Sequence, residues 1–83
     1  MNEPQNFTLI RKADESGVSG TGRVLDGILW HNGKVSVCWR TKHSSIAVYD
    51  SWDDFAAIHI HSHPQNQTLV VWASVPLTDE YVY

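Results

Sequence analysis

The Asn32-Gly33 pair constrains this chain more than any other feature, because it lies between two segments rich in β-branched, aromatic and aliphatic residues. Asn-Gly is the pair most typical of a two-residue type I′ turn between antiparallel strands. We therefore predict a β-hairpin whose strands are Gly22–His31 and Lys34–Arg40.

The length of this loop also predicts the register of the hairpin and the two faces of its sheet. A two-residue loop pairs Trp30 with Val35, and Ile28 then lies opposite Val37. Because side chains alternate along a strand, one face is expected to gather Ile28, Trp30, Val35, Val37 and Trp39. Gly27, inside the first strand, marks a bulge or a close approach of the backbone.

The rest of the chain consists of short apolar bursts separated by turn-forming residues. We predict further strands at Phe7–Lys12, Ser45–Tyr49 and Thr68–Ala73. Ser51, followed three residues later by Asp54, indicates the N-cap of a helix of about two turns. The fold class is therefore mainly β with one short α-helix between strands four and five. Both a five-stranded SH3-like small barrel and an antiparallel sheet covered by the helix fit this order.

The length of 83 residues predicts a single small domain spanning 1–83, with a core at about 7–75 and a tail at 76–83. A chain this short buries only roughly 60% of the surface that its unfolded form exposes. Its stability is therefore expected to be modest unless copies associate, which favours a homo-oligomer.

Charge and cysteine content exclude several classes of protein. A net charge of −3 with a pI near 5.9 argues against nucleic-acid binding, which usually requires a basic face. Cys38 is the single cysteine, so no intramolecular disulfide can form and a cytoplasmic setting is expected; mid-strand, its thiol should be buried and inert. No stretch approaches 18 apolar residues, which argues against a membrane span.

A glycine-rich segment is the first candidate binding site. Backbone amides of such a loop can converge on an anion, and an arginine beside them can bind phosphate or carboxylate in a bidentate manner. The residues that we assign to this site are Ser16, Gly17, Ser19, Gly20, Thr21, Gly22 and Arg23. A plain surface loop between two strands is the alternative.

Three histidines at alternating positions form the second candidate site. In an extended backbone His59, His61 and His63 would point to one side and could hold zinc with one open coordination position. In a helical backbone, which the predicted helix favours at His59, they would not converge. No cofactor is expected unless this zinc site forms.

Aromatic residues near the C-terminus form the third candidate. Trp72 has the opposite parity to its apolar neighbours in the last strand, and Tyr81 and Tyr83 follow in an acidic tail. Because Trp and Tyr are enriched at protein interfaces, we predict that these three residues contact another protein chain.

Several short motifs occur in a characteristic order along the chain. They are Ser16–Val24, Trp30 followed by Asn-Gly, Val37-Cys-Trp-Arg40, Tyr49–Asp54, the closing His-x-His and Val70–Trp72. In this order the chain resembles small uncharacterised β-rich proteins of actinobacteria and their phages. The resemblance implies a small protein that binds a target in the host cytoplasm, and it transfers no catalytic residue.

These observations favour a non-enzymatic binding protein, phage-encoded, that binds a host protein or sequesters a small anionic, nucleotide-like ligand. One alternative is a metal-dependent hydrolase that uses the histidine cluster. Another is a structural component of virion assembly.

Overall fold

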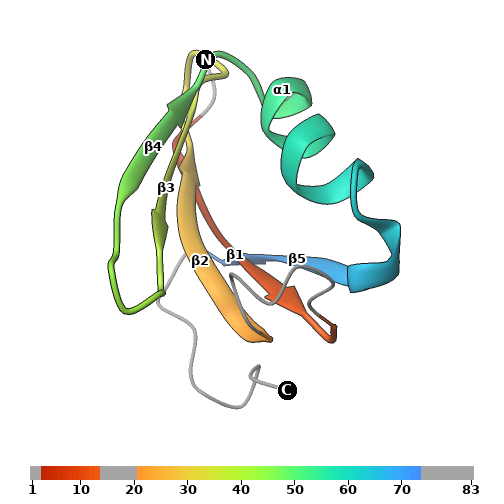
Figure 1. The fold of residues 1–83 in the computed structure, drawn as a ribbon. Coiled ribbons are helices and arrows are strands. Elements are labelled where there is room, and N and C mark those ends of the chain that lie inside the picture. The colour runs from red at the N-terminus through yellow and green to blue at the C-terminus, as the bar shows by residue number, and fades with distance from the viewer. Residues whose placement is uncertain (1–2, 14–20, 74–83) are drawn as a thin grey trace.

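The computed structural model describes residues 3–13 and 21–73, which form an antiparallel sheet with one face covered by a helical segment (Figure 1). The strands are β1 (Gln5–Arg11), β2 (Gly22–Leu29), β3 (Val35–Trp39), β4 (Ile46–Tyr49) and β5 (Thr68–Ala73), in the spatial order β4-β3-β2-β1-β5. Between β4 and β5 lie α1 (Trp52–Ala56), a π-helical turn (Ala57–His61) and a 3₁₀ turn (Pro64–Asn66). The predicted mainly β class with one short helix is confirmed.

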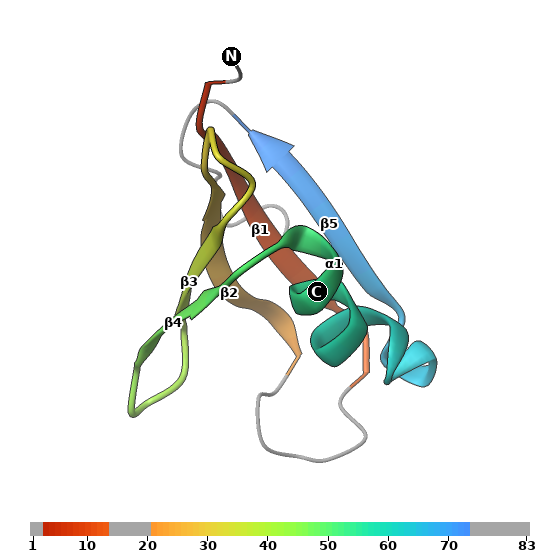
Figure 2. The same cartoon turned by 90° about the horizontal axis from the view of Figure 1, so that it is seen from above.

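The sheet is open, so the SH3-like barrel alternative is wrong. Closing a barrel would require β4 and β5, the two edge strands, to pair. Figure 2 shows α1 between the arm formed by β3 and β4 and the strand β5. The helix places the fully buried Phe55 against the sheet, so the concave face is filled by a helix rather than by a closing strand pair.

The helix begins where the sequence predicts. Ser51 is its N-cap, in extended conformation, and the Ser51 hydroxyl accepts a 3.1 Å hydrogen bond from the backbone N–H of Asp54. Acidic residues in the first turn favour this end of the helix dipole. After the helix, His59 packs inward against Phe55, whereas Ile58 is 50% exposed.

The register of the central hairpin differs by one residue from the prediction. Leu29, and not Trp30, pairs with Val35. The backbone N–H of Trp30 donates to the Lys34 carbonyl at 2.8 Å, and the N–H of Gly33 donates to the Trp30 carbonyl at 3.0 Å. The loop therefore contains three residues and ends in Gly33 at φ 89°, which is the three-residue hairpin with a left-handed last residue.

This shift moves the side chains of β2 to the other face. Val35, Val37 and Trp39 share one face as predicted, and the helix covers that face, but Ile28 and Trp30 lie on the opposite, outer face. Trp30 is 39% exposed there, and its Nε1 donates to the Ser36 hydroxyl at 2.8 Å. Cys38 shares this outer face and is exposed, which corrects the expectation of a buried thiol.

Gly27 meets the predicted requirement for a close approach, here by an aromatic ring. A Cβ on Gly27 would lie 2.3 Å from Cζ of Phe7, the residue directly opposite on β1. The bulge is elsewhere in β2: the register shifts between Leu9 and Ile10, so Val24 is the extra residue. The buried apolar core lies between sheet and helix and comprises Phe7, Leu9, Val24, Leu25, Val35, Val37 and Phe55.

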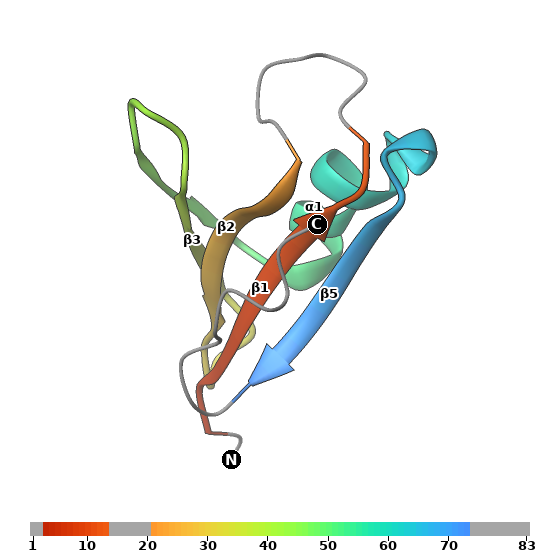
Figure 3. The ribbon, with the colours of Figure 1, turned by 90° about the horizontal axis from the view of Figure 1, so that it is seen from below.

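The two ends of the sheet differ in the connections that they carry. The loop end is where β1 finishes at Arg11 and β2 starts at Gly22, which pair with each other. The turn end is where β2 finishes at Leu29 and β3 starts at Val35. Figure 3 shows β1 between β2 and β5 as these strands run from one end of the sheet to the other.

Candidate functional site

The predicted glycine loop is described only at its second half. Ser16, Gly17, Ser19 and Gly20 lie outside the described residues. Thr21 is exposed, whereas Gly22 is buried and has φ 79°, a conformation that favours glycine. Both therefore lie at the loop end of the sheet, beside Arg11.

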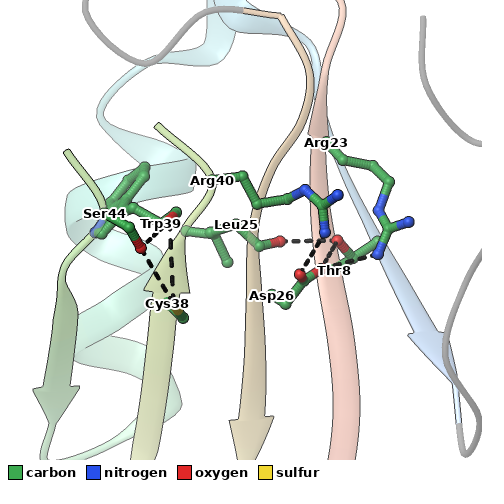
Figure 4. Close-up of polar contacts among 8 residues, drawn as sticks. All are labelled: Thr8, Arg23, Leu25, Asp26, Cys38, Trp39, Arg40 and Ser44. Atoms are coloured by element: carbon green, nitrogen blue, oxygen red, sulfur yellow. Dashed lines mark hydrogen bonds and ion pairs between the residues drawn. The ribbon is translucent and has the colours of Figure 1, made fainter. Parts of the chain in front are cut away.

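Arg23, the proposed anion ligand, takes part in a polar network on the outer face of the sheet (Figure 4). One oxygen of the Asp26 carboxylate accepts from Arg23 at 3.1 Å and from the Thr8 hydroxyl at 2.7 Å. The other oxygen accepts from Arg40 at 2.7 Å. Because the side chain of Arg23 is only 10% exposed, its main local role is to hold the start of β2 against the rest of the outer face.

Asp26 is the centre of this network. Burial alone would raise the pKa of its carboxyl, but the hydrogen bonds from Thr8, Arg40 and Arg23 outweigh burial, and the pKa lies below the ordinary value of 3.8. Asp26 is therefore ionised at neutral pH. Two guanidinium groups share one carboxylate, which leaves this cluster with a positive net charge.

Positive charge collects at the loop end, although the whole chain is acidic. The basic residues at or next to this end are Arg11, Lys12, Arg23, Arg40 and Lys42. The turn end has the opposite charge: Asp50, Asp53 and Asp54 follow β4 there, with Lys34 bound to Asp50 at 3.2 Å. Among the residues that the structure describes, basic side chains therefore gather at the loop end and acidic side chains at the turn end.

A second arrangement lies on the concave face, where the π-helical turn meets β4. Nε2 of His59 and the hydroxyl of Tyr49 are 2.7 Å apart and share a hydrogen bond. The imidazole is surrounded by rings, with centroid distances of 5.2 Å to Trp39 and 5.3 Å to Phe55. A terminal guanidinium N–H of Arg11, which is almost fully buried, donates to the backbone carbonyl of His59 at 3.0 Å.

These surroundings decide the protonation state of the pair. Burial lowers the pKa of His59, and the positive charges of Arg11 and His63 lower it further, so the imidazole is neutral at pH 7. Burial raises the pKa of Tyr49, so its phenol stays protonated. A neutral imidazole hydrogen-bonded to a phenol can accept a proton, which is the property a general base requires.

The three histidines predicted as zinc ligands are not brought together. His59 packs inside the aromatic cluster, whereas His61, two residues along the π-helical turn, is exposed, and His63 follows the turn. Helical backbone rotates residues two apart to different faces. Within residues 3–13 and 21–73, no group of three or more His, Cys, Asp or Glu side chains is placed to hold a metal ion.

The predicted interface residue Trp72 lies on edge strand β5, on the helix-covered face, and is 45% exposed. Its ring contacts Trp52 at a centroid distance of 5.0 Å and Phe7 at 5.3 Å. Tyr81 and Tyr83 lie outside the described residues.

Two of these features were missed in the sequence. Asp26 carried a signal, because a carboxylate inside an apolar strand needs partners, and Arg23 precedes it by three residues. The Tyr49–His59 pair carried none, since a separation of ten residues across a strand and a helix matches no local period.

Comparison with known proteins shows which family the chain belongs to. A family model described as "Acb5 phage protein" matches residues 4–74, which is most of the chain. No curated protein and no solved structure matches it. None of the helices described is both long enough and apolar enough to span a bilayer.

Proposed function

Because the chain belongs to the Acb5 phage protein family, we propose that it is a phage-encoded, non-enzymatic binding protein that acts in the host cytoplasm. Its ligand is a small anion of the nucleotide type, held at the loop formed by residues 16–23. The observation that carries this proposal is the concentration of basic residues at the loop end of an otherwise acidic molecule.

The chemistry of this end supports an anionic ligand in two ways. Glycine-rich backbone can turn several N–H groups toward one point without steric cost, and such nests bind phosphate. Positive potential at the mouth of the site raises the local concentration of anions. Arg23 contributes charge and fixes the start of β2, and its hydrogen bond to Asp26 holds it in place.

The binding test uses isothermal titration calorimetry with AMP, ATP and inorganic phosphate as probes. The double variant Gly20→Ala with Arg23→Lys should weaken binding of the preferred probe by about tenfold or more, equivalent to about 1.4 kcal/mol. Lys34→Gln, at the turn end, is the matched control and should bind as the wild type does. Unchanged binding by the double variant, with circular dichroism confirming its fold, would refute the loop site.

The alternative function is binding to a host protein. Trp72 offers an exposed aromatic surface on β5 for it. Trp72→Ala should then abolish capture of the host protein without changing the affinity for AMP, ATP or phosphate.

A second candidate function, hydrolysis, is favoured by the Tyr49–His59 pair. In the tautomer in which Nε2–H of His59 donates to the Tyr49 hydroxyl, Nδ1 can take a proton from water. The water oxygen then bonds to the phosphorus of a phosphodiester while one P–O ester bond breaks and its alcohol leaves. The probe is bis(p-nitrophenyl) phosphate. If the wild type releases p-nitrophenol and His59→Gln does not, the protein is a hydrolase and the non-enzymatic proposal is refuted.

A further inference from the structure

Strand β4 leaves one edge of the sheet open. It is the first strand in the order β4-β3-β2-β1-β5, and no other described strand pairs with its outer side (Figure 2). Edge strands of monomeric proteins usually carry a charge, a proline or a bulge that prevents pairing with another chain. The sequence of β4, Ile46-Ala47-Val48-Tyr49, contains no charge and no proline, and its register with β3 is regular.

The hydrogen-bond pattern shows which residues face this edge. The backbone N–H of Trp39 donates to the Ser45 carbonyl at 3.0 Å, and Trp39 and Ser45 are in register with the β3–β4 pairs. Bonding alternates along an antiparallel pair, so Ala47 also directs its backbone groups toward β3. The N–H and C=O groups of Ile46 and Val48 therefore point outward, toward the open edge.

The side chains of the same two residues are exposed. Ile46 is 74% exposed and Val48 is 68% exposed, both on the outer face of the sheet. They are β-branched residues, which favour strand pairing and pack well against each other across strands.

The charges on either side of β4 favour a second copy of the chain as its partner, in antiparallel orientation. Arg40 and Lys42 lie before β4, and Asp50 and Asp53 lie after it. An antiparallel strand of identical sequence brings the basic flank of one copy beside the acidic flank of the other, on both sides. A parallel strand would bring like charges together.

We propose that β4 pairs antiparallel with β4 of a second copy, about a twofold axis at Ala47. Ile46 of each copy then forms a two-hydrogen-bond pair with Val48 of the other, and the two five-stranded sheets become one continuous sheet. This surface differs from Trp72, which lies on the opposite edge strand, and the proposal does not depend on any ligand.

The test is sedimentation velocity of the full chain from about 10 to 500 µM, since a short edge contact is expected to have a roughly micromolar Kd. The wild type should reach twice the 9.4 kDa mass of one chain, and Val48→Lys should remain at 9.4 kDa. Ile58→Lys changes another exposed apolar residue, on the helix, and should still dimerise. Circular dichroism confirms that both variants are folded.

A charge swap tests the geometry of the pairing. Lys42→Asp alone should weaken the dimer at least about threefold, because it removes the net positive charge of the flank that contains Arg40 and places a carboxylate toward Asp50 of the other copy. Adding Asp50→Lys should restore much of the affinity, because it exchanges the two charges at positions 42 and 50 and makes that pair attractive again. A wild type that is monomeric throughout, a Val48→Lys variant that dimerises normally, or a dimer that dissociates on Trp72→Ala would each overturn the proposal.

Discussion

At the scale of single residues, Asp26 shows how a carboxylate inside a β-strand is made stable. It accepts from Thr8 in β1, from Arg23 in β2 and from Arg40, which directly follows β3. Asp26 therefore links neighbouring strands on the outer face and also balances the local positive charge.

Replacing Asp26 by Asn should lower the free energy of unfolding by about 1–2 kcal/mol, because Asp26 is partly exposed and the full cost of a buried pair does not apply. Urea denaturation at pH 7 measures this loss. The difference from the wild type should shrink as the pH falls below 3.8, where the carboxylate of the unfolded chain becomes protonated. Asp50→Asn, at a far more exposed ion pair, is the control and should change stability by less than about 0.5 kcal/mol.

His59 makes a second residue-scale prediction. Its pKa is lower in the folded chain than the ordinary 6.5, so below pH 6.5 the unfolded chain binds more protons. The free energy of unfolding should therefore fall as the pH drops from about 7.5 to 5.5. His59→Gln should flatten this slope. A slope that is unchanged in His59→Gln would show that other groups cause it.

At the scale of elements, one glycine accounts for the register of the hairpin. Gly33 has φ 89°, and nothing lies within 4 Å of where its Cβ would be, so its requirement is conformational and not steric. It supplies the left-handed last residue of the three-residue loop.

Gly33→Ala should therefore destabilise the protein by about 1–2 kcal/mol through left-handed backbone strain. Gly33→Asn should cost less, since Asn tolerates this conformation better than other residues. Thermal melts of the two variants beside the wild type give the comparison. Equal melting temperatures for Ala and Gly at this position would contradict the observed loop.

At the scale of the whole molecule, one helix residue holds the open sheet together. Phe55 has no exposed surface and contacts rings from the first strand, β4 and the helix itself, including Phe7 and Tyr49. A chain of 83 residues has a total free energy of unfolding of roughly 4–12 kcal/mol, so truncating one such side chain removes a large fraction of it.

Phe55→Ala is expected to cost about 3–5 kcal/mol and to leave the chain partly unfolded at 37 °C. Ile58→Ala, three residues later and half exposed, should cost less than about 1 kcal/mol. Guanidinium denaturation of both variants tests whether the helix covers the sheet as described. Similar losses for the two variants would contradict that packing.

Local chemistry made several features predictable. The Ser51 cap and the Asn-Gly turn depend on neighbours within three residues, so the helix start and the hairpin position follow from short patterns. The Thr68–Ala73 strand was predicted with the same bounds for the same reason. The prediction of which β2 side chains face the core was wrong, because an Asn-Gly pair occurs in both two- and three-residue hairpin loops. A register shift of one residue moves each side chain to the other face of the sheet.

The sequence by itself determined the strand-rich class, the single capped helix and the place of the turn, since each rests on backbone preferences of adjacent residues. Only the tertiary structure decided that the sheet stays open, that Asp26 binds Arg40 and that Tyr49 meets His59. These outcomes depend on residues ten or more positions apart packing against one another, and no periodicity along a chain encodes the distance between such pairs.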